Sequence, residues 1–291
     1  MSWRRSRTFR AVVTAAVLVF AIATAYAFLS KQPPAGETPG VQQGPAGVVP
    51  QRMNLAVYYV KITADDAYLV REVHEVPHTA EAAKASLEEL INVNPSTSGA
   101  ERVLPPGTKI RGITVKDGLA TVDFSREVLH ANVGAAGEAL GIQSIVNTLT
   151  EFAEIKKVSF LVEGKLDNQA MDWWGHVGLY SQPFERDVSK VYEPPIWVTS
   201  PVSGQKVGSP LEVRGSARVF EAAVNGRLKD QSGKTLAEGF TTAERGAPGR
   251  GDYVLSLLFD VSSPGSGNLE VFWISPKDGS EKDKIVVPLV W

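Results

Sequence analysis

The residues of this chain that come closest to a catalytic motif are His74 to His78, which read H-E-V-P-H. In zinc proteases the pattern H-E-x-x-H places two histidine ligands on one face of a helix, with the glutamate positioned to activate water. Pro77 lies inside the motif, and in a helix interior its ring would cost about 3 kcal/mol. The preceding residues favour a strand, and Thr79 favours the start of the next helix. We therefore expect these histidines to lie at a strand-to-helix turn and to bind no zinc.

A second polar cluster lies in the segment Ser144–Phe152, S-I-V-N-T-L-T-E-F, whose apolar residues recur at helical spacing. On a helical projection the apolar side chains fall within an arc of about 120°. Asn147 points away from this arc, and Thr148 and Thr150 flank it on opposite sides. Reacting groups must converge on one atom, and these three diverge. We expect two boundary threonines and a surface asparagine, so that Asn147→Arg changes stability by less than about 0.5 kcal/mol. The functional alternative is a protein-contact face.

Aromatic residues gather between residues 171 and 187, and three of them suggest a binding role: Trp173, Trp174 and Tyr180. Such rings can stack on a sugar or a peptide, but a cluster of this kind more often closes the edge of a core. Both interpretations stay open.

The other candidate motifs are disfavoured by their context. No G-x-S-x-G motif of a serine nucleophile occurs. The glycine-rich stretches G-A-P-G-R-G and P-G-S-G lie between strand-like runs, whereas a phosphate loop joins a strand to a helix. The carboxylates of V-K-D-G-L and P-K-D-G-S are typical of hairpin turns and lack the further ligands of a calcium site. We expect no catalytic residue, no metal and no cofactor, and therefore no enzyme.

The overall composition excludes further classes of function. The chain has 30 Lys+Arg and 32 Asp+Glu, and the resulting net charge of -2 gives no basic footprint for nucleic acid. It contains no cysteine, which excludes disulfides, thiolate metal sites and a lipidated cysteine. Its 291 residues are enough for two domains.

The N-terminus predicts a membrane anchor. Four arginines between residues 4 and 10 precede Ala11–Leu29, a run of 19 residues without charge. This length approaches the roughly 20 residues that cross a bilayer, and the arginines favour an N-in, C-out topology. The alternative is a signal peptide cleaved after Ala27, because Ala25-Tyr26-Ala27 fits the small-x-small pattern. We expect the uncleaved anchor, since the apolar run exceeds the usual signal core of about 7–15 residues.

Four segments follow from these patterns. Residues 1–29 are the cytoplasmic N-terminus and anchor, and residues 30–53 are a flexible Pro/Gly-rich linker. Residues 54–187 read β-β-α-β-β-α-β, with a hairpin turn at Asp117-Gly118, and predict an α+β domain with helices packed on a sheet. Residues 194–291 contain about seven short strand-like runs and predict an immunoglobulin-like β-sandwich.

Three motifs in the first domain resemble the GerMN domain of sporulation and spore-germination proteins. They are P-x-G-T-K at residues 105–109, K-D-G-x-A-x-V-D at residues 116–123, and V-N-T-L-T-E-F at residues 146–152. The resemblance spans Leu55 to about Asp187, and the later part is similar to the immunoglobulin-like domain that accompanies GerMN. This implies an envelope protein of an endospore-forming bacterium, with no catalytic residues to carry over. Similarity of the GerMN fold to ring-building domains implies an oligomeric scaffold by analogy.

The functional expectation is a membrane-tethered, non-enzymatic scaffold outside the cytoplasm. Its expected partners are other envelope or sporulation proteins, with self-association as a further option and no nucleic acid. The candidate contact residues are those of the two clusters above. The alternative is an envelope module that binds glycan or peptidoglycan through Trp173, Trp174 and Tyr180.

Overall fold

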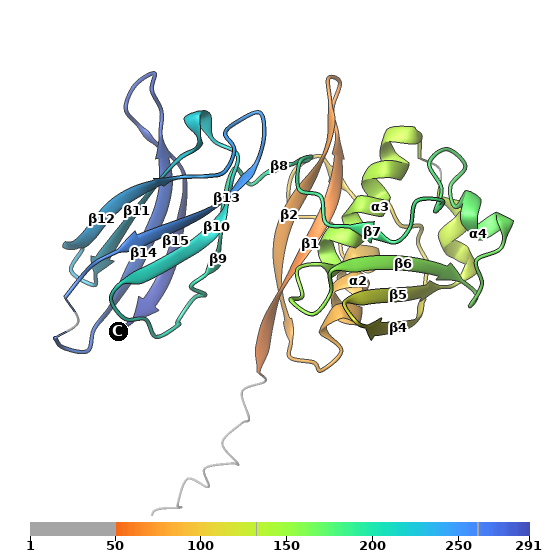
Figure 1. Ribbon diagram of the computed structural model, residues 1–291, viewed down its shortest axis with the longest axis horizontal. Coiled ribbons are helices and arrows are strands. Elements are labelled where there is room, and N and C mark those ends of the chain that lie inside the picture. Colours follow the sequence, from red (N-terminus) through yellow and green to blue (C-terminus); the bar gives the residue numbers. More distant parts are fainter. Residues whose placement is uncertain (1–50, 132, 261) are drawn as a thin grey trace, which may run out of the picture. The chain divides into compact units, whose positions relative to one another are not determined.

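The computed structural model describes residues 51–131, 133–260 and 262–291 (Figure 1). The predicted anchor Ala11–Leu29 and the linker up to residue 50 lie outside the described residues. Within the described part of the chain, no helix combines the length and the hydropathy that a bilayer crossing requires.

The first sheet of the α+β domain is built on a long antiparallel hairpin. β1 (Arg52–Ile62) pairs along its whole length with β2 (Ala67–Pro77). Two short strands extend the pair, β3 (Ala100–Glu101) beside β1 and β8 (Val191–Glu193) beside β2. The sheet order is β3-β1-β2-β8. The H-E-V-P segment lies in β2, so the expected strand is confirmed, and β1 begins two residues before the predicted boundary.

A second sheet contains β4 (Ile110–Lys116), β5 (Leu119–Phe124), β6 (Lys157–Val162) and β7 (Phe184–Glu185), in that order. The hairpin between β4 and β5 turns at Asp117 and Gly118, whose φ angles are 50° and 82°, as the Asp-Gly signal predicts. β5 and β6 run parallel. The expectation of one sheet is therefore wrong. Apolar periodicity identifies strands, but it does not show which strands pair with which.

Four helical segments accompany these sheets. They are α2 (Ala82–Asn92), the 3₁₀ segment η1 (Arg126–His130), α3 (Ala135–Leu149) and α4 (Asn168–Asp172). The apolar stripe of α3, with Ile142, Ile145, Val146 and Leu149, lies in the domain core as predicted. The core also receives the inward residues of β5 and β6, whose burial alternates along each strand.

The second domain is a two-sheet sandwich. One sheet has the order β13-β10-β9 and the other β12-β11-β14-β15. Their bounds are β9 (Ile196–Ser200), β10 (Leu211–Ala217), β11 (Ala223–Asp230), β12 (Thr235–Thr242), β13 (Gly251–Leu257), β14 (Ser266–Ile274) and β15 (Glu281–Val290). Burial alternates strictly along β13, and its inward residues meet those of β11 and β14 in one apolar core. The predicted sandwich of about seven strands is confirmed.

Candidate functional site

Asn147 is fully buried, which corrects the expected surface position. Its Nδ2 donates to the carbonyl of Asp187 at 2.6 Å, and its Oδ1 accepts from the Asp187 N–H at 3.1 Å. The Oδ1 also accepts from Gln143 Nε2 at 2.8 Å. The chain that follows β7 therefore covers the side of α3 that was expected to face solvent. Asn147 gives this chain segment the hydrogen bonds that a neighbouring strand would otherwise give, and Asn147→Arg would place a charge in a buried site.

Thr148 is also fully buried, and it completes the edge of β1. Its Oγ1 accepts from the Tyr58 N–H at 3.1 Å, and the hydroxyl of Ser144 donates to the Tyr58 carbonyl. Two hydroxyls of α3 thus satisfy one residue of an otherwise open strand edge. Thr150 is half-buried, and its hydroxyl donates to the Val146 carbonyl at 2.8 Å. The expected boundary position is therefore wrong for Thr148 and right for Thr150. Asn147 and Thr148 are packing residues that contact different segments of the chain.

The charged centre beside this helix is Glu151, which the sequence reasoning did not single out. Its carboxylate accepts from the Tyr58 hydroxyl at 2.5 Å, from Arg186 at 2.8 Å and from Arg71 at 3.2 Å. The side chains of Glu151 and Arg71 are 17% and 9% exposed, so the pair is largely shielded from water. The partners lie on β1, β2 and the segment after β7, far apart in sequence. A local sequence pattern therefore could not predict these partners of Glu151.

The electrostatics of Glu151 limit what it can do. Burial alone would raise the pKa of its carboxyl, but Arg71, Arg186 and the Tyr58 hydroxyl outweigh burial and lower that pKa to about 2. Burial and the Glu151 charge raise the pKa of Tyr58. At neutral pH Glu151 is therefore an anion and Tyr58 a neutral phenol. Neither has a pKa near the working pH that general acid–base catalysis favours.

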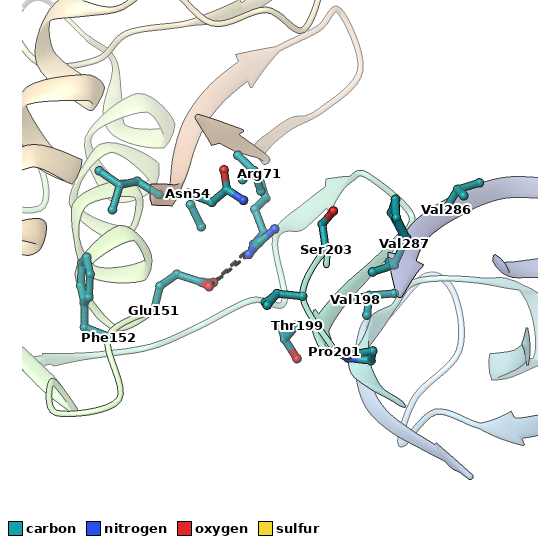
Figure 2. A pocket seen from close by; sticks show the side chains of 15 residues that line it. Asn54, Arg71, Glu151, Phe152, Val198, Thr199, Pro201, Ser203, Val286 and Val287 are labelled. Atoms are coloured by element: carbon teal, nitrogen blue, oxygen red, sulfur yellow. Dashed lines mark hydrogen bonds and ion pairs between the residues drawn. The ribbon is translucent and has the colours of Figure 1, made fainter. Parts of the chain in front are cut away.

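A groove of about 690 Å³ adjoins this ion network (Figure 2). Its polar lining includes Asn54, Thr199 and Ser203, with the Arg71–Glu151 pair marked in Figure 2. The rest of the lining is mainly apolar, from Leu55, Ala56, Val73, Phe152, Val198, Pro201, Val202, Val286, Val287 and Pro288. No histidine lines the groove to activate its hydroxyls. The arrangement suits contact with an apolar chain segment better than covalent chemistry.

His74 is engaged on both sides of its ring. Its Nδ1 lies 2.7 Å from Glu89 and its Nε2 lies 3.1 Å from Glu72. Glu72 in turn accepts from the N–H groups of Ser96 and Thr97, at 2.9 Å and 2.7 Å. Burial alone would raise the pKa of Glu72, but these hydrogen bonds outweigh burial and lower that pKa to about 2. The cluster fixes the loop after α2. In the described residues no group of three His, Cys, Asp or Glu side chains is arranged so that it could hold a metal ion.

Trp173 and Trp174 are buried, being 4% and 8% exposed. Trp173 packs against Phe124 and Phe160, and Trp174 Nε1 donates to the Val128 carbonyl at 2.5 Å. The interpretation as core closure is therefore confirmed. The glycan-stacking interpretation loses both tryptophans, because their ring faces are covered by protein. Tyr180, at 63% exposed, is the member of the trio that solvent reaches.

Both domains match families of sporulation proteins. Residues 56–167 match the family described as "Sporulation and spore germination", and residues 195–280 match the "Immunoglobulin-like domain of bacterial spore germination". The chain is a GerMN-domain protein of sporulation and spore germination. We use "GerMN domain" for residues 52–193, which hold the two four-stranded sheets, and "immunoglobulin-like domain" for residues 195–291.

A curated relative supports this assignment. The chain is 33% identical over 103 residues to the spore germination protein GerM of Bacillus subtilis (strain 168), an alignment that covers 34% of this chain and 28% of that protein. The chain thus spans less than a third of the length of that relative.

Solved structures of the same relative are also similar to this GerMN-domain protein. The first GerMN domain of the Bacillus subtilis sporulation protein GerM shares 26% identity at a TM-score of 0.39, over 46% of this chain and 98% of that one. Its tandem GerMN domains share 18% identity at a TM-score of 0.41, over 73% and 63%. Because both TM-scores are below 0.5, the fold assignment rests on the strand pairing described above.

Proposed function

We propose that this protein is a non-enzymatic, membrane-tethered scaffold of the cell envelope that acts in sporulation or spore germination by holding partner proteins. The observation that carries the proposal is the pair of adjacent matches, a sporulation and spore germination family followed by the immunoglobulin-like domain of spore germination. Both domains of one chain therefore belong to the same biological process.

The polar residues of the site support a binding role over catalysis. The side-chain hydrogen bonds of this site are made within the chain itself, by Asn147, Thr148 and Glu151. The adjoining groove is lined mainly by apolar side chains, which suits protein contact. The proposed anchor is Ala11–Leu29, with the described domains outside the cytoplasm and residues 30–50 setting their reach from the membrane.

The first experiment is deletion of the gene in the native sporulating host. We expect fewer heat-resistant spores or slower loss of optical density after addition of germinant, restored by the full chain. A variant with four charged residues within Ala11–Leu29 should fail to restore the phenotype if the anchor is required. Normal spore number and normal germination in the deletion strain would overturn the proposal.

The second experiment identifies partners. A photo-crosslinking residue is placed at Val286 in the groove, and a matched one at the exposed valine Val254 on β13, which lies outside the groove lining. We expect position 286 to crosslink an envelope or sporulation protein during sporulation and position 254 to do so much less. Equal crosslinking at both positions would refute the groove as a contact surface.

A further inference from the structure

β4 is an edge strand with one open side. It is the first strand of the sheet β4-β5-β6-β7, at whose margin it lies in Figure 1. The two-residue turn at Asp117 and Gly118 makes Lys116 and Leu119 a hydrogen-bonded pair, and alternation then turns the N–H and C=O groups of Ile113 and Val115 away from β5. The Phe124 carbonyl on β5 faces β6 and accepts from the Glu163 N–H, as this alternation predicts.

The open groups on β4 have no partner in the described part of the chain. Neither Ile113 nor Val115 makes a backbone hydrogen bond on this side with any described residue, and Val115 is 43% exposed. Unpaired strand groups of this kind accept a further strand, as in recognition by β-strand addition.

The other outermost strands of the described GerMN sheets are much shorter than β4. β3 and β7 have two residues each and β8 has three, against seven in β4. In the immunoglobulin-like domain the end of β15 is already occupied, because Gly204 N–H and Val207 N–H donate to the carbonyls of Pro288 and Val290. β4 is therefore the longest outermost strand of the two GerMN sheets. The outer side of β2 beyond Val70 also has no strand partner among the described residues, but that stretch lines the groove.

The charge of β4 selects the occupant. Residues 109–116 read K-I-R-G-I-T-V-K, with three cations and no carboxylate. Arg111 is paired with Asp123 and Glu163. Lys109 and Lys116 are exposed and form no salt bridge with a residue that the structure describes. A second copy of β4 would bring like charges together, which is unfavourable, whereas an acidic strand would meet opposite charge.

We propose that β4 of the GerMN domain binds an extended acidic segment of a partner protein by β-strand addition, through the backbone groups of Ile113 and Val115 with Lys109 and Lys116 beside them. This inference deepens the proposed scaffold function and rests on it, since it names the edge and the chemistry of the partner. Main-chain hydrogen bonds supply the contact and the lysines supply the selectivity.

The direct test uses the purified chain and a synthetic seven-residue peptide of alternating glutamate and valine. Amide hydrogen exchange at Ile113 and Val115 is measured with and without the peptide. We expect slower exchange at these two amides with the acidic peptide and no change with the same peptide carrying lysine in place of glutamate. Binding should weaken as salt is raised, because the lysines are exposed.

A proline substitution tests the backbone contribution to peptide binding separately from the charge contribution. Val115→Pro removes the outward N–H and should abolish binding. Its control is Val254→Pro on the edge strand β13. Val254 is a 47% exposed valine, and its N–H points away from β10 because the neighbouring outward carbonyl, that of Asp252, accepts from Glu244 N–H. This control should bind as the unchanged chain does.

Two substitutions at the hairpin turn test the charge without touching the ladder. Lys116→Gln should weaken binding of the acidic peptide about two- to threefold, and Asp117→Asn should strengthen it by a similar factor. Asparagine keeps the turn, because it tolerates the positive φ of 50° at this position. These two variants decide the matter even if Val115→Pro fails to fold.

Protection by the lysine peptide equal to that by the glutamate peptide would overturn the inference, as would unchanged exchange at Ile113 and Val115. Either result leaves the scaffold proposal standing if the deletion strain is defective. A normal deletion strain together with peptide binding at β4 would instead remove the scaffold proposal and keep the strand-addition site.

Discussion

The GerMN domain buries many polar side chains, whereas the immunoglobulin-like domain keeps most of its polar groups on the surface. The buried polar residues of the GerMN domain are Glu72, Ser86, Thr108, Ser125, Glu138, Ser144, Asn147 and Thr148, and those of the immunoglobulin-like domain are Ser216, Arg250 and Ser275. The difference follows from how each domain satisfies its backbone. The two antiparallel sheets of the immunoglobulin-like domain pair most of its backbone groups in ladders. In the GerMN domain, short strands, loops and helix flanks leave backbone groups that side chains must satisfy.

Glu138 and Arg250 are buried charged residues, one in each domain, that satisfy backbone groups outside the ladders. Glu138 is fully buried and accepts from the N–H groups of His176 and Val177, both at 2.8 Å, so it orders a loop. Burial lowers the pKa of Arg250 to about 9, and its guanidinium donates to the carbonyls of Val191 and Pro194 at 2.8 Å and 2.6 Å. In both cases a buried charge replaces missing strand partners. The comparison teaches that polar burial in this chain marks backbone left outside ladders.

The largest expected effect tests the buried ion network of the GerMN domain. Glu151→Gln should lower the free energy of unfolding by about 3 to 5 kcal/mol at pH 7, because Arg71 and Arg186 lose their shared counter-charge. The folded pKa of about 2 lies below the ordinary 4.5, so this stabilisation is complete above pH 4.5 and is lost as the pH falls toward 2. Urea denaturation at pH 7 and at pH 2.5 measures it. A difference between the two proteins that persists unchanged at low pH would contradict the assignment.

Asn147 and Asn268 give a matched pair of asparagines in the two domains. Asn147→Leu should cost about 2 kcal/mol, because it removes both hydrogen bonds between the fully buried Asn147 side chain and the backbone of Asp187. Asn268 on β14 is exposed, so Asn268→Leu should change stability by less than about 0.5 kcal/mol. Thermal unfolding of both variants provides the comparison. Equal losses would mean that the segment around Asp187 does not cover α3.

Gly141 tests how tightly α3 is packed. Glycine-to-alanine changes in helices usually stabilise by about 0.5–1 kcal/mol. A Cβ at Gly141, however, would lie 2.6 Å from both Trp174 and Val103, so Gly141→Ala should destabilise by about 1–3 kcal/mol. Gly208 of the immunoglobulin-like domain has no heavy atom within 4 Å of such a Cβ, and Gly208→Ala should be nearly neutral. Stabilisation by Gly141→Ala, measured by urea denaturation, would sink the packing argument.

The smallest effect is expected at the charge network on the outer face of the immunoglobulin-like domain, where Glu270 keeps Lys229 and Lys284 as partners when Arg227 is removed. Arg227 contacts Glu270 and Glu281 at 2.7 Å and 2.9 Å on the outer face of its sheet. Arg227→Gln should cost about 0.5–1 kcal/mol, and the cost should shrink in 1 M NaCl. Denaturation at low and high salt measures the change. A cost as large as that of Glu151→Gln would erase the distinction between the two networks.

The sequence predicted the strands of the immunoglobulin-like domain well because inward and outward residues alternate with period two along them. It also predicted the hairpin at Asp117-Gly118 and the apolar stripe of α3, since each is set by neighbours within a few residues. It placed Asn147 on the surface because a helical projection shows only the periodicity of one element. Residues 184–188, which cover that side, are almost forty positions away.

Local chemistry therefore determined where strands, turns and helices form, and the family motifs determined the biological context. Only the tertiary structure decided that Glu151 meets Tyr58, Arg71 and Arg186, that Asn147 holds Asp187, and that the edge of β4 stays open. The physical reason is range. Backbone propensity and side-chain periodicity act over one or two turns of chain, whereas burial and ion pairing depend on segments that meet only after folding.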